Sequence, residues 1–184
     1  MFGKSRKVDT EDELYEIAIR ALMRRSHSVS EMKKLLARRA DSDLLAQVVL
    51  ARLKEGGKLD DSRYAKQFVR QRTEIRRQGK FRIMRDLRAR GVPDRHIDAA
   101  LKSAAADNAD TASDETALIR HRIQRKLKLL RGPGSNKQVD DKKIASLYRS
   151  LLRAGFAAHA IRRELKSLTS EDLPDSGTDD EEPS

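Results

Sequence analysis

The stretch LRARGVPDRHIDAAL, residues 87–101, contains the pattern that decides the fold. In it, a leucine is followed four positions later by a small residue and ten positions after that by a second leucine. The pattern occurs three times, as Leu36, Ala40 and Leu50, as Leu87, Gly91 and Leu101, and as Leu151, Gly155 and Leu165. A small residue permits a tight left-handed exit between two helices, and the flanking apolar side chains hold the helices together. Three such pairs in order predict an internal repeat.

The sequence around these pairs is typical of helices and shows few strand patterns. Capping-box spacing at Thr10 and Glu13, and again at Ser28 and Glu31, marks two helix starts. Asp60 is the expected N-cap of another helix. The expected helices begin near residues 11 and 29 and then cover residues 42–55, 60–77, 80–90, a segment from Pro93, 114–130, 140–154 and 157–168. The sequence therefore predicts an all-α fold of tandem three-helix repeats, with about nine helices.

Composition favours an elongated arrangement of these repeats. Hydrophobic and charged residues each make up 38% of the 184 residues, and aromatic residues only 4%. Shallow cores between neighbouring helices suit this balance better than one deep core. The expected organisation is a flexible N-terminus (1–10), a first repeat (11–57), a second repeat (58–105), a linker (106–113), a third repeat (114–168) and an acidic disordered tail (169–184).

The charge of the chain is strongly divided along its length. The net charge is +11, but residues 169–184 carry seven acidic side chains and no Lys or Arg. Without that segment the net charge rises by seven, to +18, on the first 168 residues. Such an excess indicates a polyanionic partner, because clustered Lys and Arg attract phosphates and release counterions. Acidic protein surfaces are a second kind of partner that fits.

Nothing in the sequence indicates catalysis. There is no cysteine, no glycine-rich phosphate loop and no nucleophile elbow. The four histidines lack the spacing of a helical metal pair; they are His27, His96, His121 and His159. We therefore expect no catalytic residue, metal or cofactor. No stretch has the length and apolar character of a signal peptide or a membrane span, so we expect a cytoplasmic protein with no membrane partner. We also expect a monomer.

The basic residues are the main candidates for function. The candidate binding surface comprises Arg63, Lys66, Arg70, Arg72, Arg76, Lys80, Arg82, Arg85, Arg88 and Arg90 in the fourth and fifth expected helices, with Arg120 and Arg125 in the seventh. Arginine dominates over lysine, and its planar fork suits bidentate contacts with phosphate or carboxylate. The alternative is an ordinary solvated polar face. Since Tyr15, Tyr64 and Phe68 fall on apolar stripes, we expect phosphate contacts without base stacking.

These residues resemble a known family of regulatory proteins. The string Leu59-Asp60-Asp61-Ser62-Arg63-Tyr64-Ala65, followed by Phe68-Val69, Gly79-x-x-Arg82-Ile83 and Leu87-x-x-x-Gly91-Val92, resembles the RecX family. Within the first repeat, Arg25-Ser26-His27-Ser28 and Glu31-Met32 do so too, and residues 114–168 around Gly155 do so more loosely. Three features depart from the family pattern, namely Lys58, Ala40 in place of a helix-ending glycine, and the acidic tail.

The resemblance implies a regulator of the RecA recombinase. RecX proteins bind the RecA filament on single-stranded DNA, largely independently of DNA sequence, and restrain its ATP hydrolysis, strand exchange and SOS coprotease activity. Their tandem three-helix repeats form a curved, elongated body that fits the groove of the filament. The alternative is an independent helix-turn-helix regulator in which a helix such as 80–90 lies in the major groove of duplex DNA.

Overall fold

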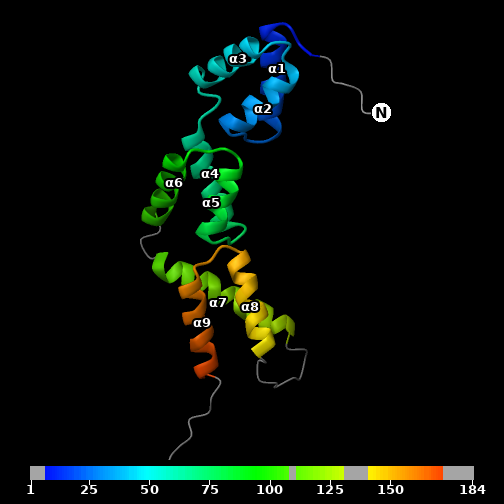
Figure 1. Ribbon diagram of the computed structural model, residues 1–184. Helices are drawn as coiled ribbons and strands as arrows, with labels where there is room; N and C mark the ends of the chain where they lie inside the picture. Colours follow the sequence, from blue (N-terminus) through cyan, green and yellow to red (C-terminus); the bar gives the residue numbers. More distant parts are fainter. Residues whose placement is uncertain (1–6, 108–110, 131–140, 172–184) are drawn as a thin grey trace, which may run out of the picture. The chain divides into compact units, whose positions relative to one another are not determined.

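The computed structural model describes residues 7–107, 111–130 and 141–171, which are helical with short connections (Figure 1). These ranges contain nine helices and no β-strand: α1 (Glu11–Arg24), α2 (Val29–Arg39), α3 (Asp43–Glu55), α4 (Asp61–Glu74), α5 (Lys80–Ala89), α6 (Asp94–Asp107), α7 (Thr111–Leu130), α8 (Asp141–Arg153) and α9 (Ala158–Glu171). The predicted all-α fold is confirmed for the described residues. Most helix boundaries lie within one to three residues of the expected positions.

Two of the three expected N-terminal caps are present. Ser28 and Glu31 form both bonds of a capping box at the start of α2. The carboxylate of Asp60 accepts from the backbone N–H groups of Ser62 and Arg63, 2.7 and 3.2 Å away, at the start of α4. At α1 the prediction was wrong, because the side chain of Thr10 makes no cap hydrogen bond.

Left-handed glycines end the middle helices of the second and third repeats. Gly91 has φ +72° and Gly155 has φ +89°. The N–H of Val92 donates to the carbonyl of Leu87 (3.1 Å), and the N–H of Gly91 donates to the carbonyl of Arg88 (2.8 Å). This bond pair is a Schellman motif, and the same pair occurs around Gly155. In these two repeats the carbonyl of the leucine is therefore an acceptor in the helix C-cap, and the small residue is the left-handed glycine of that cap.

The first repeat ends its middle helix in a different way. Ala40 is extended, with φ −70° and ψ 147°, because a side chain disfavours the left-handed conformation. Val8 then pairs alongside Ala40, donating to the carbonyl of Arg39 and accepting from Asp41, both at 2.8 Å. The structure thus ties Val8 to α2, whereas we expected a flexible segment throughout residues 1–10. Residues 1–6 lie outside the described ranges.

Each repeat has its own small core. The leucines that open the predicted pattern are all buried, and so are the residues six positions after the small residue: Leu36, Leu87, Leu151, Ala46, Ile97 and Ile161. Three separate clusters of buried side chains result, one within α1–α3, one within α4–α6 and one within α7–α9. Some large apolar side chains stay outside these cores, among them Val48 (42% exposed) and Ile75 (73%).

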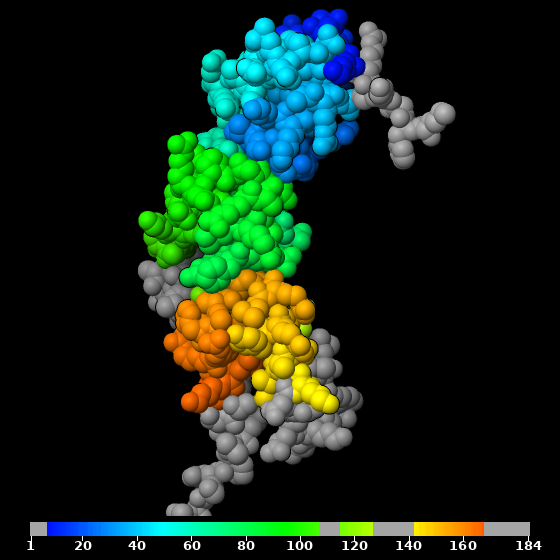
Figure 2. Space-filling model, in the orientation of Figure 1, coloured from blue at the N-terminus to red at the C-terminus, as the bar shows by residue number. Residues whose placement is uncertain are grey.

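The chain forms two compact units, Met1–Ala109 and Asp110–Ser184. The first holds the first and second repeats, whose surfaces touch in the space-filling view (Figure 2). The boundary falls within the expected linker, 106–113, although α6 and α7 leave only residues 108–110 between them, outside the described ranges. Helix α9 continues three residues into the expected tail. The rest of that tail, 172–184, lies outside the described ranges, as do residues 131–140.

Candidate binding surface

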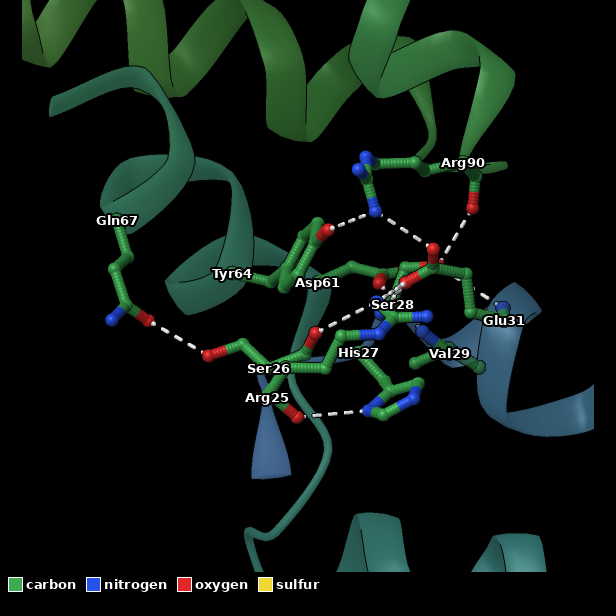
Figure 3. A network of polar contacts seen from close by, with 10 residues as sticks. All are labelled: Arg25, Ser26, His27, Ser28, Val29, Glu31, Asp61, Tyr64, Gln67 and Arg90. Carbon is green, nitrogen blue, oxygen red and sulfur yellow. Dashed lines mark hydrogen bonds and ion pairs between the residues drawn. The ribbon is translucent and has the colours of Figure 1, made fainter. Parts of the chain in front are cut away.

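A network of polar contacts joins the first repeat to the second (Figure 3). The carboxylate of Asp61, at the start of α4, accepts from the backbone N–H of Val29 at 2.9 Å. The hydroxyl of Ser28 donates to the carbonyl of Arg90 at 2.6 Å. The N-terminus of α2 is therefore capped partly by a side chain of the second repeat, and its own cap residue satisfies the end of α5. We call this network the repeat junction.

Arg90 links three elements at the repeat junction. Its Nη1 lies 2.8 Å from a carboxylate oxygen of Glu31 and 3.2 Å from the hydroxyl of Tyr64. Arg25 bonds the other oxygen of Glu31 at 3.1 Å. Burial alone would raise the pKa of Glu31, but the hydrogen bonds from Arg25 and Ser28 and the charges of both arginines outweigh it, so the pKa lies below its usual 4.5. The carboxylate stays ionised and holds both guanidinium groups.

His27 is buried beside the repeat junction, with 9% of its surface exposed. Its Nδ1 lies 2.9 Å from the carbonyl oxygen of Arg25, which suits a neutral ring that donates from Nδ1. Burial lowers the pKa of His27 below 6.5, and the nearby charge of Arg25 adds to this effect. Next to it, Ser26 donates to Gln67 of α4 at 3.4 Å. The Arg25–Ser28 segment therefore contacts the second repeat, through Ser26 to Gln67 and through Ser28 to Arg90.

A second feature of the first unit is a group of arginines around Phe68, which we call the arginine cluster. The guanidinium carbon of Arg72 lies 4.7 Å from the centre of the Phe68 ring, and that of Arg90 lies 5.3 Å from it. Arg76 and Arg82 complete the group, since their charges act on Arg72.

The arginine cluster has a deficit of negative charge. Burial lowers the pKa of Arg72, and the positive charges of Arg76, Arg90 and Arg82 lower it further, while the negative charge of Asp86 raises it. The Nε of Arg72 is also buried and makes no hydrogen bond with the described residues. A phosphate or carboxylate supplied by a partner would relieve the repulsion among these guanidinium groups, so the arginine cluster is a candidate anion site.

Several residues of the candidate surface are already held by contacts within the protein. Their guanidinium groups reach carbonyl or carboxylate oxygens at 2.7–3.1 Å: Arg63 with Gly57, Arg70 with Glu74, Arg88 with Asp94, Arg90 with Glu31 and Arg120 with Glu164. Glu164 is only 4% exposed, which makes its pair with Arg120 part of the third repeat's packing. By contrast, Lys66, Arg85 and Arg125 are exposed and form no ion pair with the described residues.

Sequence reasoning missed some residues of these sites. Asp61 was named only as part of the string that resembles the RecX family, and not as a contact of α2, because such a contact depends on how two repeats meet. Sequence reasoning also assigned Arg90 to an open surface. The capping-box spacing from Ser28 indicated Glu31 only as a cap residue. Its pairing with Arg90 spans 59 residues and leaves no local pattern.

Comparison with known proteins agrees with the structure. A family model described as the second three-helix domain of RecX matches residues 60–101. A regulatory protein RecX of Halorhodospira halophila is 34% identical over 157 residues, which cover 85% of this chain and 89% of the relative. The chain belongs to the RecX family. The RecX protein of Chlorobium phaeobacteroides is a further relative, 30% identical over 161 residues that cover 87% of this chain and 97% of that one.

Solved RecX structures share the fold. The crystal structure of RecX from Lactobacillus salivarius matches with a TM-score of 0.67 at 19% identity, over 86% of this chain and 96% of that one. A second crystal structure of a RecX protein matches with a TM-score of 0.65 at 19% identity, over 83% and 71%. The RecX family is one of regulatory proteins and not of enzymes, as the sequence predicted. Among the described helices, none is long and apolar enough to cross a membrane.

Proposed function

We propose that this RecX protein binds the RecA filament on single-stranded DNA and restrains its ATP hydrolysis, strand exchange and coprotease activity. The observation that carries the proposal is membership of the RecX family over most of the chain. The excess of basic residues supports it, because a RecA filament offers both DNA phosphates and acidic protein surface. The protein would act in the cytoplasm, as a monomer.

The proposed contact residues of the first unit are Arg72, Arg76 and Arg82 of the arginine cluster, together with the exposed Lys66 and Arg85. The cluster has the deficit of negative charge described above, and the two exposed side chains have no internal partner to lose among the described residues. Arg125 is the corresponding candidate on α7. Arg90 and Arg120 are instead proposed as positioning residues, since their guanidinium groups are bound to Glu31 and Glu164.

The direct test adds the purified protein to a reaction of RecA, single-stranded DNA and ATP. The wild type should lower ATPase activity and strand exchange at stoichiometric amounts. The absence of any effect at those amounts would refute the proposal. The double variant Arg72→Ala/Arg85→Ala should inhibit less at equal concentration. Lys102→Ala, which removes an exposed positive charge of α6 that is not among the proposed contact residues, is the control and should inhibit as the wild type does.

The helix-turn-helix alternative makes a different prediction. Placing α5 in the major groove should give tight, sequence-selective binding to duplex DNA, together with dimers that match spaced half-sites. A gel-shift comparison of random single strands, random duplex and genomic fragments separates the two functions. Preference for particular duplex fragments without any effect on RecA would favour the alternative.

A further inference from the structure

The solvent side of α5 carries an aromatic ring in line with basic side chains. Phe81 lies in the first turn of α5 with 52% of its surface exposed. Arg85 and Arg88 follow at four and seven positions, so all three share one face of the helix. Ile83 and Leu87 occupy the opposite face and are buried in the core of the second repeat. The exposed ring is therefore on the same side as the basic residues.

The core of the second repeat does not include this ring. The aromatic side chains of that core are Tyr64 and Phe68, both buried, with ring centres 6.1 Å apart. Phe81 instead has the ammonium group of Lys80 at 5.4 Å from its ring centre. An exposed phenyl ring beside cations fits a partner that presents both a flat π face and negative charge. Our expectation of phosphate contacts without base stacking rested on Tyr15, Tyr64 and Phe68 and did not take this ring into account.

The surroundings of Phe81 are also strongly basic. Residues 70–90 hold nine lysines and arginines against two acidic residues, Glu74 and Asp86. Both acidic side chains are within 4.0 Å of an arginine of the same helix. The connection before α5 keeps Arg77 at φ +48°, a left-handed conformation that is uncommon for a side-chain-bearing residue and is often found at functional sites. In the same connection, Ile75 is 73% exposed.

We propose that Phe81 stacks on an unpaired base of single-stranded DNA while Lys80 and Arg85 contact its phosphates. This deepens the function proposed above and rests on it for the identity of the strand. A single strand fits better than a duplex, since duplex bases stack on one another and offer no free face. It also fits better than a protein surface, because only the strand repeats a π face and a negative charge in every unit. Stacking is tolerant of sequence, as the proposed function requires.

The absence of tryptophan from the sequence permits a direct probe of stacking. In Phe81→Trp, a short oligothymidylate should quench the single indole emission, because the indole would stack on thymine. An abasic strand of equal length, which has phosphates and no bases, should bind without comparable quenching. Leu44→Trp is the matched control: it lies on α3, is 71% exposed and is far in sequence from the basic residues. Equal quenching of both tryptophans would overturn the proposal.

Affinity provides the second measurement, made with DNA alone. Phe81→Leu keeps an apolar side chain without a π face and should weaken oligothymidylate binding about five- to 150-fold. Phe81→Tyr should bind within about threefold of the wild type. Wild-type affinity in Phe81→Leu, or a tryptophan at 81 that responds to RecA or duplex but not to the single strand, would refute the stacking contact. Because the affinity measurement uses DNA alone, its result is independent of whether the protein inhibits the filament.

Discussion

At the residue scale, the two adjacent carboxylates Asp60 and Asp61 stabilise different helices. Asp60 accepts from backbone N–H groups of its own helix, α4. Asp61 turns to the first repeat and accepts from Val29, the first residue of α2. The first N–H groups of any helix lack partners within that helix, so a carboxylate supplied by another element both satisfies a donor and favours the helix dipole. Asp61 thus couples two repeats through one hydrogen bond.

Removal of this hydrogen bond gives a prediction for Asp61. Asp61→Ala should lower the free energy of unfolding by about 1–2 kcal/mol, as measured by urea denaturation, because the N–H of Val29 loses its acceptor. Val29→Pro removes the donor at a helix position where proline is tolerated. In the Val29→Pro background, Asp61→Ala should therefore cost much less. Additive effects of the two substitutions would mean that the carboxylate acts on something other than Val29.

Asp60 gives a simpler prediction. Asp60→Ala should lower the free energy of unfolding by about 1 kcal/mol, because α4 loses its N-cap. Since this cap lies within one repeat, the effect should be the same in the Val29→Pro background. A melting temperature equal to that of the wild type would contradict the cap.

His27 predicts how stability depends on pH. Its pKa in the folded protein lies below 6.5, so the unfolded chain binds the proton more readily. The stability that neutral His27 contributes is fully present above pH 6.5 and is lost as the pH falls through the folded-state value. Between pH 7.5 and 5, His27→Gln should therefore lose less stability than the wild type does. Glu31 does not affect the test in this interval. Its pKa is lowered, so the stability that its carboxylate contributes is lost below pH 4.5.

The experiment for His27 is urea denaturation at several pH values across that interval. His159→Gln serves as the control for loss of a histidine in general, since His159 is exposed on α9. If wild type and His27→Gln lost stability in parallel, the buried neutral ring would not be the cause.

At the scale of elements, glycine at a helix end serves two purposes. Gly57 and Gly91 both adopt left-handed conformations, with φ +64° and +72°. A Cβ at Gly57 would meet nothing within 4 Å, whereas a Cβ at Gly91 would lie 2.4 Å from the hydroxyl oxygen and 2.5 Å from the Cβ of Ser30. Gly91 therefore allows the turn after α5 and also lets the first repeat approach it.

These two glycines form a matched pair of substitutions. Gly57→Ala should lower the free energy of unfolding by about 1–2 kcal/mol, the conformational cost alone. Gly91→Ala should cost roughly 2–5 kcal/mol, because overpacking against Ser30 adds to that cost. Adding Ser30→Gly to Gly91→Ala should recover part of the difference. Equal costs at the two glycines, measured by denaturant unfolding, would show that Ser30 yields without strain.

At the scale of the whole molecule, three small cores replace one large one, and part of the positive charge is used to hold repeats together. Arg90 joins the first two repeats through Glu31 and Tyr64, and Arg120 is bound to the buried Glu164. A guanidinium group with a fixed internal partner has fewer donors left for a phosphate. Fewer basic side chains are therefore available for a partner than the number of lysines and arginines in the sequence indicates.

Salt dependence of DNA binding distinguishes these two uses of arginine. Arg85→Ala should reduce the slope of log affinity against log salt by about 0.7 if its one phosphate contact is with a single strand. Arg90→Ala should instead reduce the stability of the first unit, because Glu31 would be left half-buried with one partner fewer. An unchanged slope in Arg85→Ala would place that side chain on a protein-facing or idle part of the surface.

The sequence by itself determined the helices, their grouping and the family, because these depend on signals within a few residues. The spacing from Leu87 to Gly91 to Leu101 encodes a helix C-cap and the pair of helices around it, and both glycine caps of this kind formed as expected. Ala40 does not adopt the left-handed conformation of the two glycines. Its extended backbone pairs with Val8, a residue more than thirty positions away in the sequence.

Only the tertiary structure decided which polar residues face a partner and which face the protein. Asp61 and Arg90 carry the same charges whether they face a partner or the protein itself. Which of the two they face depends on how the first repeat meets the second. The structure likewise decided that the ring of Phe81 stays exposed, at 52%, while Ile83 and Leu87 of the same helix are buried. Local periodicity specifies helices, but contacts between repeats arise from packing across long sequence separations, which no short pattern records.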